Sequence, residues 1–251
     1  MSSCSMGEVP SGNQGVISAM KRTLILFTAL GVVGSAHAVV IDDFTTGLFS
    51  ASYGGNAYFT GGATVPNAVG PLRYHSTKFN ANPLFAQTFI DMLGDGKTYI
   101  ETGPGVDAEV TLAWAGGLTS GTGTFGGGSL NANQFTAIPA NLSGLTGFQV
   151  GYENADQNFD LVMGFIDTTN NVFELSTPVT VTAGTGSVVI PFSSINLTNI
   201  NLASVDGVVF RAFMDHSQDV TITRLNAVPE PASMVALGAG LLALLRRSRR
   251  A

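Results

Sequence analysis

Residues 147–153, with the sequence GFQVGYE, and residues 159–166, with the sequence FDLVMGFI, decide the fold class of this chain. In the first stretch, Phe148, Val150 and Tyr152 alternate with polar residues or glycine, which is the period of a strand with one buried face. The second stretch is apolar on both faces, as in a central strand. Both patterns predict β-structure.

Similar short segments, bounded by Gly, Pro or Asn, occur on either side of these two. They are residues 39–44, 73–79, 97–102, 108–114, 172–175, 179–181, 188–192, 208–213 and 220–225. Between residues 39 and 228 no stretch repeats apolar residues at helical spacing over three turns, and no internal repeat has a fixed period. We therefore expect an all-β domain at residues 39–227, built as a β-sandwich or barrel.

An N-terminal export signal precedes this domain. Lys21 and Arg22 are followed by a nearly uninterrupted apolar run over residues 23–33 and by the small residues around Ala36 and Ala38. A basic segment, a short apolar helix and an A-x-A site form a secretory signal peptide, here residues 20–38, which signal peptidase would remove after Ala38. We expect residues 1–19 to be a mis-assigned leader. It holds Cys4, the only cysteine, so the exported form has no thiol.

A second apolar segment ends the chain, at residues 228–251. Pro229, Glu230 and Pro231 precede fourteen mostly apolar residues, 232–245, for which we expect a helix of about 21 Å. This length is below the roughly 30 Å of the hydrocarbon core, so by itself it also allows an ordinary buried helix. The cations that follow favour a short transmembrane helix instead. The terminal cations, which place this end on the cytoplasmic side, are Arg246, Arg247, Arg249 and Arg250.

This tail resembles the PEP-CTERM sorting signal of Gram-negative bacteria, because the motif, the helix and the Arg cluster occur in that family's order. The resemblance implies that an exosortase recognises the tail and cuts near the Pro-Glu-Pro motif. It also implies passage from a transient inner-membrane anchor to the cell surface or extracellular matrix, alongside exopolysaccharide. A permanent single-span anchor is the alternative.

The charge of the exported domain limits its partners. Residues 39–228 hold five basic and fifteen acidic residues, a net charge of −10. Nucleic-acid binding requires clustered Lys and Arg, so we exclude it as a function. Such an acidic surface keeps a protein soluble and repels anionic polymers unless cations bridge the two.

The ends of the domain carry a second resemblance. Residues 41–47, IDDFTTG, and residues 219–225, DVTITRL, resemble the first and last strands of galactose-binding-like jelly rolls. The resemblance implies a jelly-roll β-sandwich whose terminal strands pair and which often binds carbohydrate. Pairing would bring Asp42 or Asp43 close to Asp219, where the acids would hold a structural calcium ion. Solvated acids are the alternative interpretation, with no cofactor at all.

Two other patterns are weaker than they first look. Residues 121–126 match G-x-G-x-x-G, but glycines rather than a helix follow them, so we read a flexible loop. Asp156, Asn158, Asp160 and Asp167 have the spacing of a calcium loop, but Leu161 replaces its central glycine. A polar hairpin turn at residues 153–158 is our interpretation.

We expect the domain to bind rather than catalyse. His75 and His216 are the only histidines outside the signal, and no G-x-S-x-G motif is present. For carbohydrate binding, Trp114 is our candidate stacking residue. An aromatic ring packs on the apolar side of a sugar, while carboxylates or amides accept hydrogen bonds from the hydroxyl groups of the sugar. The other available rings are Tyr58, Tyr74, Tyr99 and Tyr152, the last of which we expect in the core.

The sequence thus predicts a surface-sorted matrix protein that binds carbohydrate and is not an enzyme. Three alternatives stay open. The first is an exported hydrolase with an unrecognised site, for which Asp215 and His216 are the residues to test. The second is a passive structural or adhesive protein. The third is an ice-binding protein, which the scattered T-x-T pairs support poorly.

Overall fold

The predicted strands are present in the structure, a computed structural model that describes residues 37–54, 63–65, 69–118, 132, 135–138, 140–229 and 240. The N-terminal strands are β1 (Val39–Asp42), β2 (Phe49–Tyr53), β3 (Ala63–Thr64), β4 (Leu72–Ala81), β5 (Thr88–Met92), β6 (Thr98–Thr102), β7 (Asp107–Ala115) and β8 (Gly117–Leu118). The later elements are β9 (Phe135–Thr136), β10 (Gly147–Ala155), β11 (Phe159–Asp167), β12 (Val172–Leu175), β13 (Val179–Val181), β14 (Gly184–Pro191), the 3₁₀ turn η2 (Phe192–Ser194), β15 (Gly207–Met214) and β16 (Asp219–Val228).

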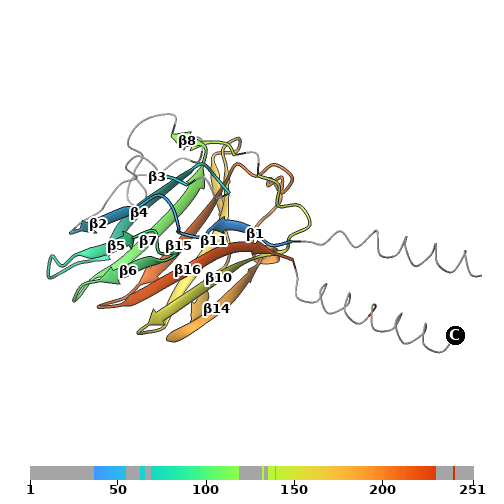
Figure 1. The fold of residues 1–251 in the computed structure, drawn as a ribbon. Helices are drawn as coiled ribbons and strands as arrows, with labels where there is room; N and C mark the ends of the chain where they lie inside the picture. Colours follow the sequence, from blue (N-terminus) through green and yellow to red (C-terminus); the bar gives the residue numbers. More distant parts are fainter. Residues whose placement is uncertain are drawn as a thin grey trace, which may run out of the picture. The chain divides into compact units, whose positions relative to one another are not determined.

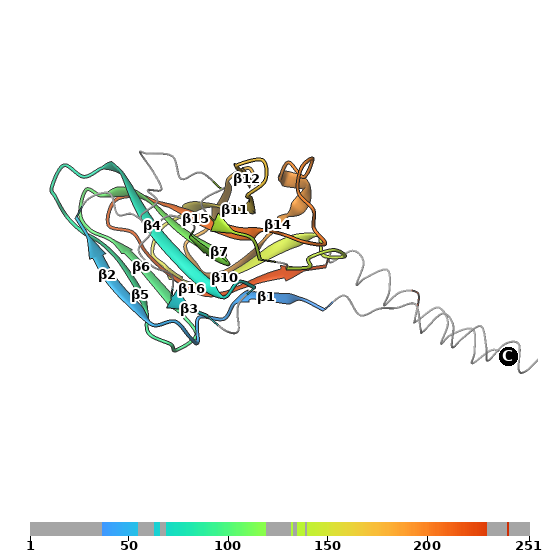
Figure 2. The same cartoon turned by 90° about the horizontal axis from the view of Figure 1, so that it is seen from above.

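Fourteen of these strands form two antiparallel sheets and β8 pairs with β9 as a small third one, so the prediction of an all-β sandwich is confirmed (Figure 1). Sheet A has the order β14-β10-β16-β6-β5-β2, with β1 also paired to β16. Sheet B has the order β12-β11-β15-β7-β4-β3, with β13 also paired to β11. Figure 2 shows the two layers from above, with β16 and β10 in one and β15 and β7 in the other.

The chain crosses between the layers after four of the long strands. The pairs β4/β5, β6/β7, β10/β11 and β15/β16 follow each other in sequence, yet the two members of each pair belong to different sheets. This winding of paired strands around a common core is the kind from which jelly rolls are built. It places four turns, residues 82–87, 103–106, 156–158 and 215–218, at one end of the sandwich, which we call the crossover end.

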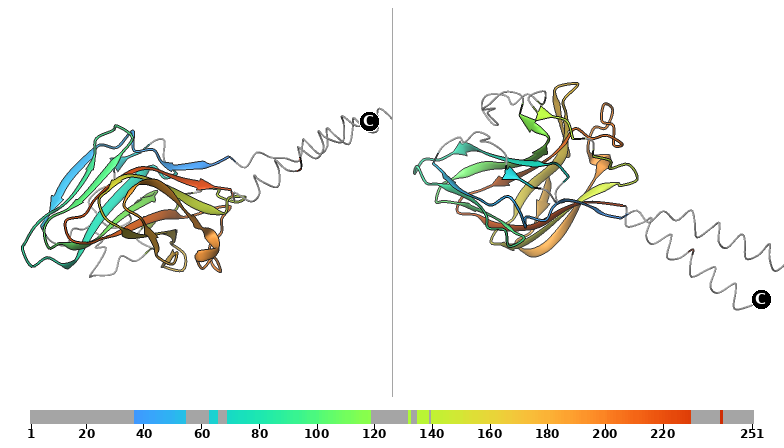
Figure 3. Two further views of the ribbon diagram at one scale, coloured as in Figure 1. Left: turned by 90° about the horizontal axis from the view of Figure 1, so that it is seen from below. Right: turned by 45° about the horizontal axis from the view of Figure 1, so that its top comes forward.

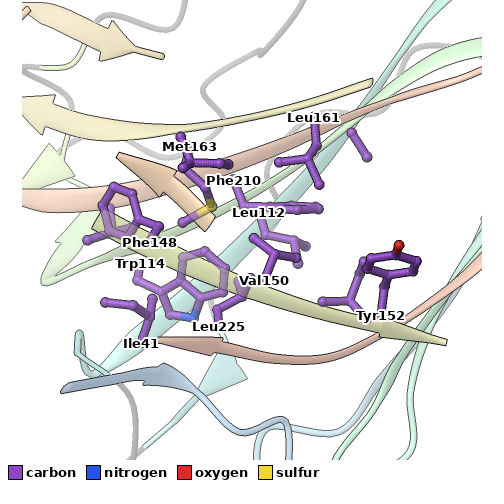
Figure 4. Packing of buried hydrophobic residues seen from close by; sticks show 14 of the residues in the cluster. Ile41, Leu112, Trp114, Phe148, Val150, Tyr152, Leu161, Met163, Phe210 and Leu225 are labelled. Carbon is purple, nitrogen blue, oxygen red and sulfur yellow. The ribbon is translucent and has the colours of Figure 1, made fainter. Parts of the chain in front are cut away.

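The core fills the space between the sheets (Figure 4). Alternate residues of β10 and β11 face each other there, and the rings of Phe148 and Phe165 lie 5.2 Å apart between centroids. Phe192, in η2, closes this cluster at 4.8 Å from Phe148. The strand at residues 159–166, predicted as central, has β15 on one side and β12 and β13 on the other, as its two-faced apolar pattern requires.

The first and last strands pair, as predicted from the resemblance at the two ends. Val39 lies opposite Ala227 and Asp42 lies opposite Leu225. Figure 3 shows β1 alongside the C-terminal half of β16, so both ends of the described domain emerge at the end opposite the crossover turns.

Several predictions fall outside the described residues. They concern the signal helix up to Ala36, the glycine-rich stretch with its G-x-G-x-x-G match, and the sorting tail from Glu230 onward apart from Gly240. In the described ranges, no helix has the length and apolar character to cross a membrane.

Candidate functional site

Trp114, the predicted stacking residue, is a core residue. Its side chain is fully buried in β7 and lies among Ile41, Phe148 and Leu225 (Figure 4). Its indole Nε1 donates a hydrogen bond of 2.7 Å to Asp42 Oδ2. A ring without exposed surface cannot stack on a sugar, so this prediction is wrong. Trp114 follows Val110 and Leu112 at every second position of β7, and all three side chains point into the core. This alternation is visible in the sequence.

The three predicted metal-binding acids do not come together. Asp42 is buried and is engaged by Arg73, whose Nη1 lies 2.6 Å from Asp42 Oδ2. Asp43 Oδ1 accepts hydrogen bonds from the backbone and hydroxyl of Thr45. Asp219 begins β16, six residues before the partner of Asp42, which is about 20 Å along the strand.

The prediction of a calcium site at these acids is therefore wrong. The terminal strands pair, but the register places Asp42 opposite Leu225 rather than opposite the start of β16. Across the described part of the chain, no group of three or more His, Cys, Asp or Glu side chains is placed to hold a metal ion.

The acidic residues whose spacing resembles a calcium loop, in residues 156–167, lie in a turn and along strand β11. Asp160 and Asp167 lie at opposite ends of the nine-residue β11, so they cannot share one ion. The turn before them joins two sheets and is not the hairpin that we predicted, because β10 pairs with β14 and β16 while β11 pairs in sheet B. Asn158 Oδ1 instead accepts a hydrogen bond from the backbone N–H of Ala183.

The outward face of sheet B carries an aromatic ring in a polar row. In β15, Phe210 and Met214 point into the core, so Arg211 and Phe213, one residue out of phase, point outward and are half-buried. Phe213 lies directly opposite Glu109 of β7 on one side and Asp160 of β11 on the other.

The polar groups along this row are held in place by their neighbours. Lys78 Nζ donates to Glu109 Oε1 at 2.7 Å, and Arg211 Nη1 lies 3.5 Å from Glu109 Oε2. At the other end, the Thr180 hydroxyl donates to Asp160 Oδ1 at 2.6 Å. The row from Lys78 to Thr180 crosses five strands, which is about 19 Å at the normal spacing between strands.

A pocket of about 300 Å³ opens beside Phe213 toward the crossover end. Carboxylates, an amide and a hydroxyl surround the ring, and the lining residues are Asp107, Asn158, Phe159, Asp160, Thr180, Phe213, Met214 and Asp215. The volume is at the lower limit for a small-molecule site. The arrangement presents hydrogen-bond acceptors around an apolar surface.

Gln218 positions two residues of this pocket from behind. The side chain is fully buried, donates through Nε2 to the Asn158 carbonyl at 2.7 Å and accepts through Oε1 from the Asp215 backbone N–H at 2.7 Å. Its backbone N–H donates to Thr102 Oγ1 at 2.8 Å. The Gln218 side chain thus links two of the four crossover turns and its backbone ties them to the end of β6, so the pocket rests on a fixed backbone.

The tyrosines named from the sequence lie elsewhere. Tyr152 is buried in the core, as predicted. Tyr74 faces outward from sheet B but is covered, with its ring 5.5 Å from that of Phe135. Tyr99 lies on the outward face of sheet A, where its hydroxyl donates to Asp95 Oδ2 at 2.6 Å. Tyr58 lies outside the described residues.

The two histidines have opposite environments. His75 is buried between the sheets, its Nε2 joined to the Tyr53 hydroxyl by a hydrogen bond of 2.6 Å, with the Phe49 ring 3.7 Å away. Burial, and then the charge of Arg73, lower the pKa of His75 from 6.5 to about 4. His216 is more than half exposed in the last crossover turn, with Nε2 3.6 Å from Asp215 Oδ1.

We did not predict Phe213 as a binding residue, although the sequence indicates that its side chain points outward. Residues 208–213 were predicted as a strand, and in that strand Phe213 shares a phase with Arg211 and not with Phe210. An aromatic residue in phase with a charged one is expected on the outward face. The neighbours Glu109 and Asp160 could not be found this way, because they depend on the order of strands in the sheet.

Comparison with known families identifies the C-terminal tail. Residues 227–250 match the model of the PEP-CTERM protein-sorting motif. The tail is a PEP-CTERM sorting motif. The match covers the Pro-Glu-Pro sequence and the terminal arginines named above, and it ends within the last residues of the chain. No curated protein matches the chain.

Among solved structures, the chain is similar to several carbohydrate-binding modules. One is the family 11 module of the cellulosomal cellulase Lic26A-Cel5E of Clostridium thermocellum, with 13% identity over 78% of this chain and 97% of that chain and a TM-score of 0.40. Another is a mutant of the family 29 module CBM29-2 complexed with mannohexaose, with 10% identity, coverage of 76% and 91%, and a TM-score of 0.35.

Proposed function

We propose that this protein is exported, sorted to the cell surface through its PEP-CTERM tail, and binds a neutral polysaccharide there through the Phe213 row. Binding, and not catalysis, is the activity that the site supports, and the binding requires no cofactor. The observation that carries the proposal is the outward Phe213 ring set between Glu109 and Asp160 in a pocket of acceptors.

The export part rests on the two ends of the chain. Signal peptidase would remove residues 20–38, and an exosortase would recognise residues 227–250 and cut near Pro229. The tail holds the protein in the inner membrane until that step, after which the domain reaches the surface or the exopolysaccharide matrix of a Gram-negative cell. Within the described domain, the first residues of β1 and the last residues of β16 lie at the end of the sandwich opposite the crossover turns and the pocket.

The binding part rests on chemistry that suits sugars. A half-buried aromatic ring covers the apolar side of a pyranose, and fixed carboxylates on either side accept hydrogen bonds from its hydroxyl groups. The row continues for about 19 Å across the sheet, which accommodates an extended chain better than a single sugar. The acidic character of the domain favours a neutral polymer over an anionic one.

Phe213→Ala should weaken polysaccharide binding about tenfold or more, because the substitution removes the apolar surface on which a sugar ring would pack. The matched control is Phe89→Ala, which removes a 39% exposed ring from the outward face of sheet A. Affinity electrophoresis in gels containing mixed-linkage β-glucan, mannan or xylan, followed by calorimetry with the matching hexasaccharides, measures both variants.

The control separates the outcomes. A loss of binding with Phe213→Ala and unchanged binding with Phe89→Ala supports the Phe213 row. Equal loss with both variants, or binding that survives Phe213→Ala and Asp160→Asn together, would mean that this face is not the binding site. If the wild-type protein binds none of the three polymers, the passive structural alternative is favoured.

A further inference from the structure

Strand β14 is the edge of sheet A farthest from β2 (Figure 1). It pairs with β10 over six consecutive residues, from Pro191 opposite Gly147 to Gly186 opposite Tyr152, without a register shift. No other strand of the described residues pairs with it. In an antiparallel edge strand, alternate N–H and C=O groups point away from the sheet and can pair with another strand.

A register shift lies at the start of β14, where Tyr152 pairs with Gly186 and Ala155 with Gly184, but from residue 186 to residue 190 this edge lacks the devices that usually protect such strands. Residues 184–191, GTGSVVIP, contain no charged side chain, and the single proline is the last residue of the strand. Charges, internal prolines, bulges and short length are the common means of blocking pairing between edges. By comparison, the edge of sheet B at β12 has only four residues and contains Glu174.

The side chains of β14 fit pairing with a like strand. Ile190 is buried and Val188 packs against the core, so Thr185, Ser187 and Val189 project from the outward face. Val189 is 41% exposed, so its apolar side chain is available for contact with a second strand. A strand of Thr, Ser and Val next to an identical strand would form favourable cross-strand pairs.

The charge of the domain points to this edge as the place where copies meet. Residues 39–228 carry a net charge of −10, and two such domains repel each other over most of their surfaces. The β14 edge is a stretch of eight neutral residues within that acidic surface. Antiparallel pairing is also self-complementary about a two-fold axis, which allows one strand to serve as both partners.

We propose that two copies of this chain associate through β14, in antiparallel orientation, so that sheet A continues from one copy into the other. The dimer covers Val189 and satisfies the outward backbone groups of both edges. It leaves the Phe213 row on sheet B free, so each dimer presents two polysaccharide-binding faces at a fixed separation. Two linked sites bind a polymer more strongly than one site does.

Cysteine cross-linking tests this contact, because the chain has no cysteine after Cys4. In a Cys4→Ser background, Thr185→Cys, Ser187→Cys and Val189→Cys are introduced one at a time into the full chain. The control is Ser52→Cys, on the outward face of β2 at the opposite edge of the same sheet. Mild oxidation on intact cells is followed by a non-reducing gel, since paired strands bring opposite Cβ atoms within reach of a disulfide.

We expect at least tenfold more disulfide-linked dimer from one β14 position than from Ser52→Cys, with the yield falling on either side of that position. Adding Val189→Lys to the Thr185→Cys or Ser187→Cys variant, which places like charges at the junction, should abolish the cross-link while the protein stays folded and exported. Absence of dimer at all three β14 positions, equal dimer from Ser52→Cys, or an unchanged yield with Val189→Lys would overturn the proposal.

Discussion

Replacing Arg73 with methionine should lower the free energy of unfolding by about 3–5 kcal/mol, because it leaves a buried carboxylate without its counter-charge. Arg73 and Asp42 are each 1% exposed, and their closest atoms are 2.6 Å apart. Arg73 Nη2 also donates to the carbonyls of Thr46 and Gly47, and the guanidinium lies over the Phe44 ring. The pair therefore ties β1 and the turn after it to β4.

A double-mutant cycle with urea unfolding measures this effect. Asp42→Asn alone should cost a comparable amount, since it leaves Arg73 charged and unpaired. The combination of Arg73→Met and Asp42→Asn should cost clearly less than the sum of the two single changes. Single changes that cost less than about 1 kcal/mol, or effects that simply add, would mean that the pair is not a unit of stability.

The second large effect is a loss of stability in acid that depends on His75. Its pKa is about 4 in the folded protein and 6.5 in the unfolded chain, because burial and the charge of Arg73 disfavour the protonated ring. The unfolded state therefore binds more protons between pH 6.5 and about 4. The free energy of unfolding should fall over that window by about 3 kcal/mol in total as the pH is lowered.

Comparison of variants isolates this contribution. Burial and neighbouring acids raise the pKa values of Glu101 and Asp219, which acts in the opposite direction, so the wild-type curve alone is a sum of effects. The free energy of unfolding of the wild type minus that of His75→Gln should therefore fall as the pH is lowered from 6.5 to about 4. The same slope in wild type and His75→Gln would contradict the prediction.

The strands that the sequence predicts well are those with a strong apolar period. Residues 172–175 and 179–181 match β12 and β13 residue for residue, and β11 extends one residue beyond its predicted end. Besides the two-residue strands β3, β8 and β9, the strands missed are β2 and β5, which read FSASY and TFIDM. Each strand has only five residues, and β5 has a polar residue, Thr88, in its inward phase and an aromatic one, Phe89, in its outward phase. Their existence depends on pairing with each other and with β6.

The site was harder to predict because it depends on strand order. Alternation places Phe213 outward, but nothing local says that Glu109 and Asp160, fifty or more residues away, lie on either side of it. The same reason explains the error at Asp42, whereas the inward phase of Trp114 could be read from its alternation with Val110 and Leu112. An aromatic and an acid that looked like ligand-binding groups bind each other inside the core, 72 residues apart in sequence. The tertiary structure brings Trp114 and Asp42 together and so gives both a structural role in the core.

The tail shows the reverse situation, because its meaning lies in the linear order of its parts. Pro229, Glu230 and Pro231, an apolar segment and four arginines were enough to predict a sorting motif that the family model then matched. An enzyme recognises such a motif by its linear sequence, so the motif can be predicted without knowledge of the folded structure. The binding face of the domain between the two ends, in contrast, can be identified only once the order of strands in the folded sheets is known.

Intact-mass analysis of the protein recovered from the cell surface tests the central claim, that this is an exported passenger with a processed sorting tail. The account predicts a chain that begins at Val39 and ends near Pro229, without the apolar segment and the terminal arginines. A mass that retains residues 232–251, or a protein found only in the cytoplasm with residues 20–38 intact, would contradict it.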